Sequence, residues 1–283
     1  MGGTKRVPHS GVGQNAPVLV DYHMHPRKPS SPEETDHTKA AVERYAEIAR
    51  ERGVDELGMT EHVYYFRETR EVWNLRYQLD RCRHSLDAYC DAVLEARRDG
   101  APVKLGLEVD WVPAHAERLA ELLDDYPWDY LLGSVHWIDG LAIDGRPGWW
   151  EQAPPEEIWE RYASELQAAA TSGFFDVLAH PDLVKIFGHR VAWDWSPLVS
   201  SLNGVALEVS SAGLHKPVGE LYPDASLLAL AREAGVAITL ASDAHVPENV
   251  GRDLDRAVEH ARGAGYDTVT IFDRRRRRQE PLG

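Results

Sequence analysis

The sequence predicts one α/β domain, a distorted TIM-like barrel in which strands alternate with helices. The length of 283 residues is close to the roughly 250 residues of a typical α/β barrel. Apolar runs of strand length alternate with segments whose apolar residues recur at helical spacing, which is typical of parallel strands. Nearly every apolar run is followed by His, Glu or Asp, at the end where α/β barrels build their active sites.

The elements follow one another in a regular order. The first strand is expected at residues 18–22, and a helix follows at 38–52, ended by Gly53. Further strands are expected at 56–60, 103–107, 130–135, 175–179, 204–207, 236–241 and 266–272. Further helices are expected at 75–98, 114–123, 155–170, 196–201, 223–234 and 248–263. The strands are continuous apolar runs, as expected for a sheet that helices cover on its outer face.

Composition and charge disfavour several classes of protein. The net charge of -15 disfavours nucleic acid as a partner, because an acidic protein repels a polyanion. The sequence contains no apolar run of the 18 or so residues that a membrane span needs. The two cysteines, Cys82 and Cys90, are expected on one helix, too far apart for a disulfide. Reduced thiols suit a cytoplasmic protein. The oligomeric state stays open.

The chain is expected to form a single domain with two short ends. Residues 1–17 are rich in Gly and polar residues and predict a flexible leader. The barrel is expected to span residues 18–273. Residues 274–283 begin with five consecutive arginines and are interpreted as a solvated, Arg-rich tail.

The polar residues at the strand ends are the main functional signal. The set consists of His23, His25, His62, Glu108, His136, His180, Asp243 and His245. Any one of them alone is more typical of a hydrogen-bonded structural residue. Alternate residues of a strand share a face, so His23 and His25 can both point inward. Eight such groups would leave many polar atoms without partners unless metal ions bind them. The ligand types suit two or three divalent transition metal ions, namely Zn, Mn or Fe.

The same residues resemble those of the PHP family, named for its polymerase and histidinol phosphatase members. The matching segments are Asp21-Tyr22-His23-Met24-His25, Thr60-Glu61-His62, Gly106-Leu107-Glu108-Val109-Asp110, Gly133-Ser134-Val135-His136, Val177-Leu178-Ala179-His180-Pro181 and Ala241-Ser242-Asp243-Ala244-His245. They occur in the family's order over residues 18–251. Residues 182–185 and 207–223 are similar to the histidinol-phosphatase branch.

The resemblance implies a distorted barrel of about seven strands and a site for up to three metals. It assigns the first metal to His23, His25, Glu108 and Asp243, the second to His62 and His245, and the third to Glu108, His136 and His180. Two positions depart from the family. The family often has a further histidine shortly after His25, where this chain offers only the more distant His37. His215 replaces an arginine that commonly precedes the lysine, which is Lys216 in this chain. An imidazole lacks the permanent charge of a guanidinium and its ability to donate two parallel hydrogen bonds to a phosphate.

The resulting hypothesis is a metal-dependent phosphomonoesterase that hydrolyses L-histidinol phosphate by attack of a metal-bound hydroxide. Asp243, Glu108 and His245 are the expected catalytic residues. Lys216, His215 and Lys185 are the expected substrate contacts. No serine or cysteine nucleophile is signalled by a local motif. The alternatives are another small phosphate ester, a C–N hydrolase of the amidohydrolase type, a nuclease, or a non-catalytic scaffold. The absence of a strand-end lysine disfavours the amidohydrolase, and the acidic charge disfavours the nuclease.

Overall fold

Seven parallel strands form the central sheet in the order β1–β4–β5–β6–β9–β10–β11. The structure is a computed structural model and describes residues 16–283, apart from the side chains of residues 32 and 149. The strands are β1 Val20–Asp21, β4 Glu56–Met59, β5 Val103–Asp110, β6 Tyr130–Ser134, β9 Val177–Leu178, β10 Ala206–Ser210 and β11 Ile238–Ala241. The sheet curls round because the Tyr22 amide donates to the Leu240 carbonyl at 2.9 Å. The predicted distorted barrel is confirmed.

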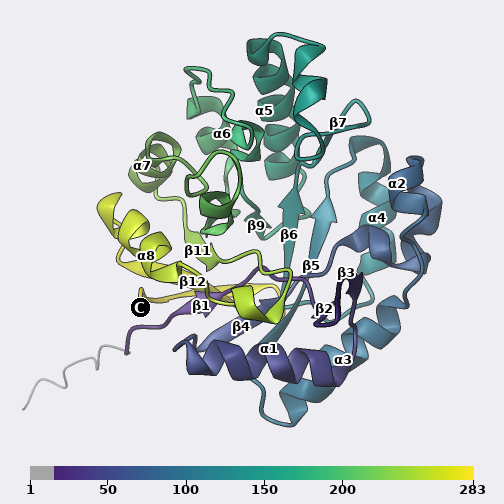
Figure 1. Cartoon of the computed structure of the whole chain (residues 1–283). Helices are drawn as coiled ribbons and strands as arrows, with labels where there is room; N and C mark the ends of the chain where they lie inside the picture. Colours follow the sequence, from purple (N-terminus) through teal and green to yellow (C-terminus); the bar gives the residue numbers. More distant parts are fainter. Residues whose placement is uncertain (1–15) are drawn as a thin grey trace, which may run out of the picture.

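Helices surround the strands on the outside of the barrel (Figure 1). They are α1 Lys39–Glu51, α2 Arg76–Leu79, α3 Leu86–Arg98, α4 Ala116–Leu123, α5 Pro155–Thr171, α6 Ser196–Ser201, α7 Ala225–Glu233 and α8 Leu254–Gly263. The first of them shows why these segments are helical. The Thr38 hydroxyl accepts from the Ala41 amide, Val42 and Tyr45 bury one face, and Gly53 ends the helix with a φ of 73°. None of the helices within residues 16–283 is long and apolar enough to cross a membrane.

The single helix predicted at residues 75–98 is wrong, because two helices occupy this stretch. The segment between α2 and α3 turns back onto the loop after β4, where the Arg83 and His84 amides both donate to the Tyr65 carbonyl at 3.0 Å. The Ser85 hydroxyl then caps α3 by accepting from the Ala88 amide. Cys82 therefore lies outside the helix that carries Cys90, and both are buried free thiols.

The predicted strand at 266–272 and the predicted Arg-rich tail form one hairpin. Strands β12 Thr268–Asp273 and β13 Arg276–Pro281 pair with each other in an antiparallel sheet separate from the barrel. The run of arginines therefore forms the turn and the start of β13, and its side chains are exposed. The Arg275 guanidinium pairs with Asp176, and the Arg277 guanidinium donates to the Gly204 carbonyl at 2.8 Å. Residues 1–15 of the predicted leader lie outside the described residues.

Aromatic side chains fill the barrel near this hairpin. The ring of Tyr130 stacks on Tyr22 with ring centres 5.0 Å apart, and on Phe272 of β12 at 5.2 Å. Gly58 makes room for this stack, since a Cβ atom at position 58 would lie 1.7 Å from the Tyr130 hydroxyl oxygen. The N-terminal end of the barrel is thus closed by packed rings and the hairpin.

Two further hairpins stand at the opposite end of the barrel. Strands β2 Arg27–Lys28 and β3 Ser31–Thr35 follow β1, and strands β7 Trp137–Ile138 and β8 Leu141–Ala142 follow β6. Each begins within two residues of a strand-end histidine, so both hairpins help to form the walls around the carboxyl ends of the barrel strands.

Candidate metal centre

All eight predicted ligands lie together at the carboxyl ends of the barrel strands. His23 and His25 follow β1, His62 follows β4, and Glu108 lies near the end of β5. His136 follows β6, His180 follows β9, and Asp243 and His245 follow β11. His180 and Asp243 have positive φ values of 26° and 51°. Residues other than glycine seldom adopt this backbone conformation, and where they do it often marks a functional site.

Glu108 stands at the centre of the group. The carboxylate is buried, and each of its oxygens contacts several imidazoles. The distances from Oε2 are 2.6 Å to His62 Nδ1, 3.4 Å to His23 Nε2 and 3.5 Å to His25 Nε2, and those from Oε1 are 3.2 Å to His180 Nε2 and 3.4 Å to His136 Nε2. Asp243 Oδ1 lies 3.4 Å from His25 Nε2. One carboxylate thus contacts five imidazoles, which is the arrangement expected of a residue that bridges several metal ions.

Several of these atoms are close to one another without forming hydrogen bonds. The buried atoms without a partner include His23 Nε2, His25 Nε2, His62 Nδ1 and Glu108 Oε2. A buried polar atom without a partner is costly. Atoms that converge without bonding to one another are, however, suitably placed to bind a shared cation. The donor set of imidazole nitrogen and carboxylate oxygen fits zinc, manganese or iron.

Buried carboxylates behind three of the histidines fix their orientation. His23 Nδ1 donates to Glu208 at 2.7 Å, His25 Nδ1 to Glu61 at 3.1 Å and His136 Nδ1 to Asp110 at 2.9 Å. A carboxylate on one ring nitrogen leaves the other, Nε2, free and more basic for a metal. The sequence analysis did not assign these three acids a role. Glu61 stands beside a candidate ligand and Asp110 two residues from one, whereas Glu208 only follows a predicted strand.

The local charges shift the pKa values of the cluster in different directions. Burial disfavours the charged form of Glu108, yet the imidazoles around it, led by His62 and His23, hold its pKa well below the ordinary value. Burial also opposes the charged form of His136, but Glu108 and Asp110 outweigh it and raise its pKa to about 10. Burial lowers the pKa of His245 to about 4, against the attraction of Asp243. The metal-free cluster therefore contains both charged and neutral imidazoles.

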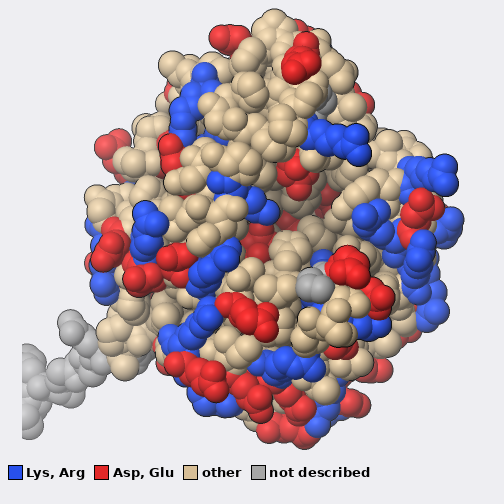
Figure 2. Space-filling model, in the orientation of Figure 1, with Lys and Arg blue, Asp and Glu red and all other residues tan. Residues whose placement is uncertain are grey.

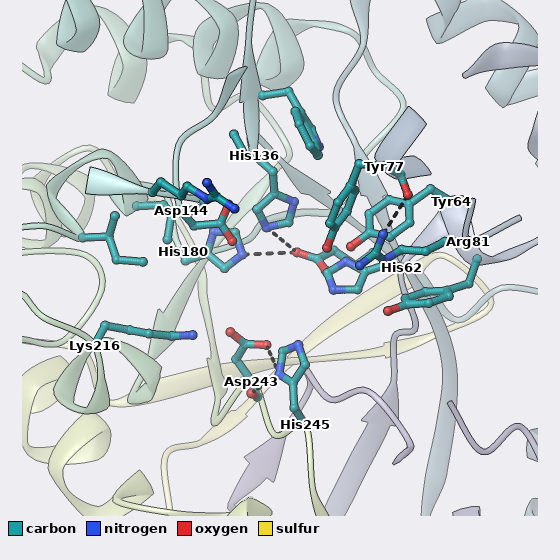
Figure 3. Close-up of a pocket in the computed structure, with 18 of the residues that line it drawn as sticks. His62, Tyr64, Tyr77, Arg81, His136, Asp144, His180, Lys216, Asp243 and His245 are labelled. Carbon is teal, nitrogen blue, oxygen red and sulfur yellow. Dashed lines mark hydrogen bonds and ion pairs between the residues drawn. The ribbon is translucent and has the colours of Figure 1, made fainter. Parts of the chain in front are cut away.

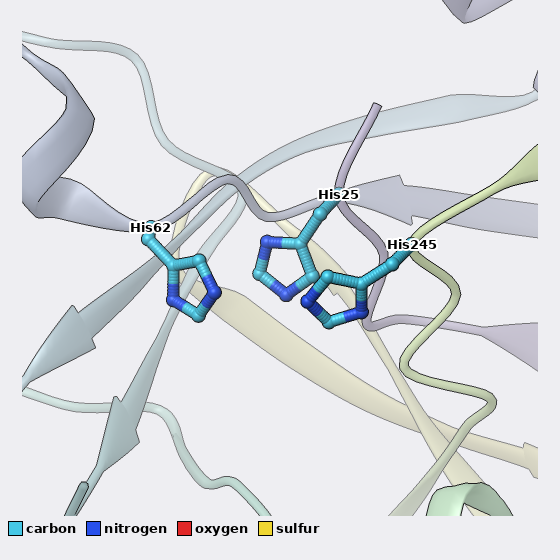
Figure 4. A group of neighbouring side chains, drawn as sticks. All are labelled: His25, His62 and His245. Carbon is cyan, nitrogen blue, oxygen red and sulfur yellow. The ribbon is translucent and has the colours of Figure 1, made fainter. Parts of the chain in front are cut away.

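Four overlapping sets of three side chains have ligand atoms within 4.8 Å of one another. The sets are His23, His25 and Asp243; His23, Glu108 and His180; His25, His62 and His245; and His62, Asp110 and His136. Figure 4 shows the third set, in which three imidazoles from three loops face a common space. These sets differ in part from the assignment that the resemblance implies. His136 shares a set with His62 and Asp110, although its Nε2 atom also lies 3.4 Å from Glu108 Oε1.

The other predicted site residues have different positions. His37 Nε2 lies 2.8 Å from Glu61 Oε2, behind His25 and away from the other ligand atoms. The ammonium of Lys185 is fully buried, 2.7 Å from Asp182, where a phosphate could not reach it. His215 pairs with Asp253 at 2.6 Å and does not line the cavity. Of the three predicted substrate contacts, the structure brings only Lys216 to the cavity.

A cavity of about 650 Å³ opens above the cluster. Figure 2 shows it as a hollow with acidic atoms inside and basic side chains around its rim. Its walls include side chains that the sequence analysis did not single out, namely Arg27, Tyr64, Tyr77, Arg81, Trp137 and Asp144. In Figure 3, Lys216 points inward beside Asp243, whereas Tyr77 and Arg81 stand on the His62 side. The size suits a small molecule of substrate dimensions.

Comparisons with known proteins agree with this geometry. The PHP domain family matches residues 21–212. A Deinococcus radiodurans protein named "Probable histidinol-phosphatase" is 30% identical over 275 residues, which cover 93% of this chain and 99% of that protein. The "Histidinol-phosphatase" of Lactococcus lactis is 22% identical and covers 89% of this chain and 94% of its own length. The crystal structure of histidinol phosphate phosphatase from L. lactis with zinc, L-histidinol and phosphate has a TM-score of 0.71 at 19% identity, covering 93% of this chain and 100% of that one.

Proposed function

This chain belongs to the PHP domain family, and on that premise we propose that it is a metal-dependent phosphomonoesterase that hydrolyses L-histidinol phosphate to L-histidinol and phosphate. The observation that carries the proposal is the cluster around Glu108, where the buried Nε2 atoms of His23 and His25 converge without hydrogen-bond partners beneath a cavity of substrate size. The names of the relatives support the choice of substrate.

We assign the ligands to three metal positions in the manner that the resemblance implies. His23, His25, Glu108 and Asp243 would hold the first metal, His62 and His245 the second, and Glu108, His136 and His180 the third. The second position has the fewest protein ligands, since His37 is bonded to Glu61 instead. We therefore expect two firmly bound ions and a third that exchanges more readily. The proposal leaves the metal as zinc, manganese or iron.

Bound divalent metals would supply an activated water and would neutralise charge on the phosphate oxygens. The chain's own residues orient the metal-binding imidazoles and surround the phosphate. Glu208, Glu61 and Asp110 hold three imidazoles in the orientation that presents Nε2 to the cavity floor. Asp243 and His245 face the cavity on the side toward which Lys216 points (Figure 3). We infer that the phosphate lies between Lys216 and these two residues.

The lining of the cavity favours attack by water over a covalent intermediate on the protein. Neither serine nor cysteine occurs among the described residues that line it. Cys82 and Cys90 are both buried thiols, and burial raises the pKa of each, which makes them poor nucleophiles.

Phosphate release by the metal-loaded protein tests the proposed function. We expect kcat/KM for L-histidinol phosphate to exceed that for sugar phosphates by at least about tenfold, because one specific substrate contact is worth that much. Equal rates on all phosphate esters would contradict the substrate. Hydrolysis of amides without hydrolysis of phosphate esters would instead favour the amidohydrolase alternative.

We further propose that the reaction serves histidine biosynthesis in the cytoplasm, with a small phosphate ester as the partner and neither nucleic acid nor a membrane. The free thiols and the net charge of -15 support this setting.

A further inference from the structure

The walls of the cavity differ in chemical character. Lys216 supplies a cation beside Asp243 and His245, while Tyr64, Tyr77 and Arg81 stand on the side of His62 (Figure 3). Asp144 lies on a further side, near His136 and His180 (Figure 3). A substrate whose phosphate occupies the metal centre therefore meets a different functional group in each direction.

Asp144 is a carboxylate in the cavity wall that has no assigned role. It follows strand β8 and is exposed. Among the described residues its carboxylate has no hydrogen bond and no ion pair, and it acts on His136 only through its charge, which helps to raise the pKa of that imidazole. It belongs to none of the groups that could hold a metal. Asp139, on the same hairpin, differs because it pairs with Arg161 at 2.8 Å. The Asp144 carboxylate thus remains available to a cationic ligand.

Aromatic rings form the neighbouring part of the wall. Tyr77 and Trp137 both line the cavity, and their ring centres lie 5.4 Å apart. Tyr64 meets Tyr77 edge to face at 5.8 Å and stacks on His62 at 4.8 Å. Such rings offer a flat surface to another aromatic ring. The arrangement suits a ligand that carries a ring as well as a cation.

We propose that Asp144 determines substrate specificity by binding the ammonium group of the substrate, while the substrate ring packs against Tyr64, Tyr77 and Trp137. This inference rests on the proposed function. L-Histidinol phosphate carries a primary amine on the carbon next to the phosphorylated one, and an imidazole ring beyond it. A carboxylate on the His136 side, apart from Lys216, can pair with that amine without drawing the phosphate away from the metal centre. Sugar phosphates lack the cation and would leave Asp144 unpaired.

Two substrates and two matched variants test the proposal. The substrates are L-histidinol phosphate and its deaminated analogue, 3-(imidazol-4-yl)propyl phosphate. The variants are Asp144→Asn and the control Asp139→Asn, which removes the same charge from the same hairpin outside the cavity. We expect Asp144→Asn to lower kcat/KM about 10- to 50-fold for the amine substrate and to leave the analogue within about twofold. Asp139→Asn should change neither value.

A binding measurement separates recognition from chemistry. The inhibition constant of L-histidinol should rise in Asp144→Asn in step with the loss of kcat/KM, and Asp144→Glu should restore part of the loss. Metal content and circular dichroism should match the parent protein.

The failure of this inference is distinguishable from the failure of the proposed function. If the parent protein hydrolyses neither substrate, the proposed function fails and the role of Asp144 fails with it. If the parent protein hydrolyses L-histidinol phosphate but Asp144→Asn lowers both substrates equally, or neither, then the function stands and Asp144 does not recognise the amine.

Discussion

The two ends of the barrel use carboxylates in opposite ways. At the N-terminal end, an aspartate precedes each of three strands and accepts a backbone amide of the neighbouring strand. Asp55 accepts from Leu19 at 2.8 Å, Asp129 from Leu105 at 2.7 Å and Asp176 from Leu131 at 2.8 Å. At the C-terminal end, Glu108 faces five imidazoles, and the buried Nε2 atoms of His23 and His25 beside it have no hydrogen-bond partner. The carboxylates of one end accept backbone amides, whereas those of the other end contact imidazoles, some of which keep a ring nitrogen open to a ligand.

This difference suggests that the residues at the N-terminal end of the barrel determine stability, whereas those at the C-terminal end determine function. The N-terminal end is closed by the β12–β13 hairpin and the stack of Tyr22, Tyr130 and Phe272. The C-terminal end carries buried atoms without partners, which cost stability until metal binds. Changes at the N-terminal end should therefore alter the free energy of unfolding and spare activity. Changes at the C-terminal end should alter activity and metal content and spare the fold.

The largest expected effect is that of Glu108→Gln. An amide cannot neutralise the charge of two cations at once, so we expect kcat/KM to fall by at least about 10³-fold and the bound metal to fall below that of the parent protein. Phosphate release and elemental analysis measure the two quantities. Circular dichroism should be unchanged. The exposed residue Glu95 provides a control, because Glu95→Gln should alter neither quantity. A Glu108→Gln protein with near-parent turnover would show that Glu108 is not a bridge.

At the other end of the barrel, Asp129→Ala should act on stability alone. This buried carboxylate accepts the Leu105 and Arg274 amides and pairs with Arg97. Its loss leaves these donors without an acceptor, so we expect the free energy of unfolding to fall by about 2–4 kcal/mol. Urea denaturation measures the change, and kcat/KM of the folded protein should stay within about twofold. Asp125→Ala, in the same loop and exposed, is the control. A comparable loss of activity would contradict the separation of the two ends.

The third prediction concerns the pH dependence of metal binding. The pKa of His136 is raised to about 10, above its ordinary value, so the proton stabilises the metal-free fold fully below about pH 6.5. That contribution disappears as the pH rises through about 10. A metal binds only the neutral imidazole, so its affinity should rise about tenfold per pH unit between these limits for one displaced proton. Chelator competition at pH 7, 8 and 9 measures the slope.

A matched variant sharpens this prediction. Asp110 raises the pKa of His136, together with Glu108 and Asp144. The variant Asp110→Asn should therefore flatten the slope of metal affinity against pH. An unchanged slope would show that the displaced proton comes from another group.

The sequence alone was enough to predict the barrel and the convergence of eight strand-end side chains, because both follow from short-range patterns. Apolar runs mark the strands, and His23, Glu108 or Asp243 stand where those runs stop. The β12–β13 hairpin could not be predicted in this way, because Arg275 and Arg277 look like a solvated run until Asp176 and the Gly204 carbonyl lie beside them.

The residues of the cavity walls could not be predicted from the sequence for a related reason. Arg27, Tyr77 and Asp144 come from irregular segments with no periodic pattern, and only the folded chain brings them together. Lys185 shows the opposite problem. It stands in a motif that resembles the histidinol-phosphatase branch, yet it is buried against Asp182. A motif identifies a residue type at a position, whereas the direction of its side chain depends on packing from distant elements.

The smallest expected effect separates two adjacent residues, Lys216 and His215. Lys216 lines the cavity and points inward (Figure 3), so Lys216→Gln should raise KM for L-histidinol phosphate about tenfold, the worth of one contact to a charged group. His215 is held by Asp253 at 2.6 Å, outside the cavity. His215→Arg should therefore leave KM within about twofold, although the position suggested from sequence that an arginine there would tighten phosphate binding. A lower KM in His215→Arg would mean that residue 215 reaches the phosphate after all. An unchanged KM in Lys216→Gln would mean that the phosphate is held without Lys216.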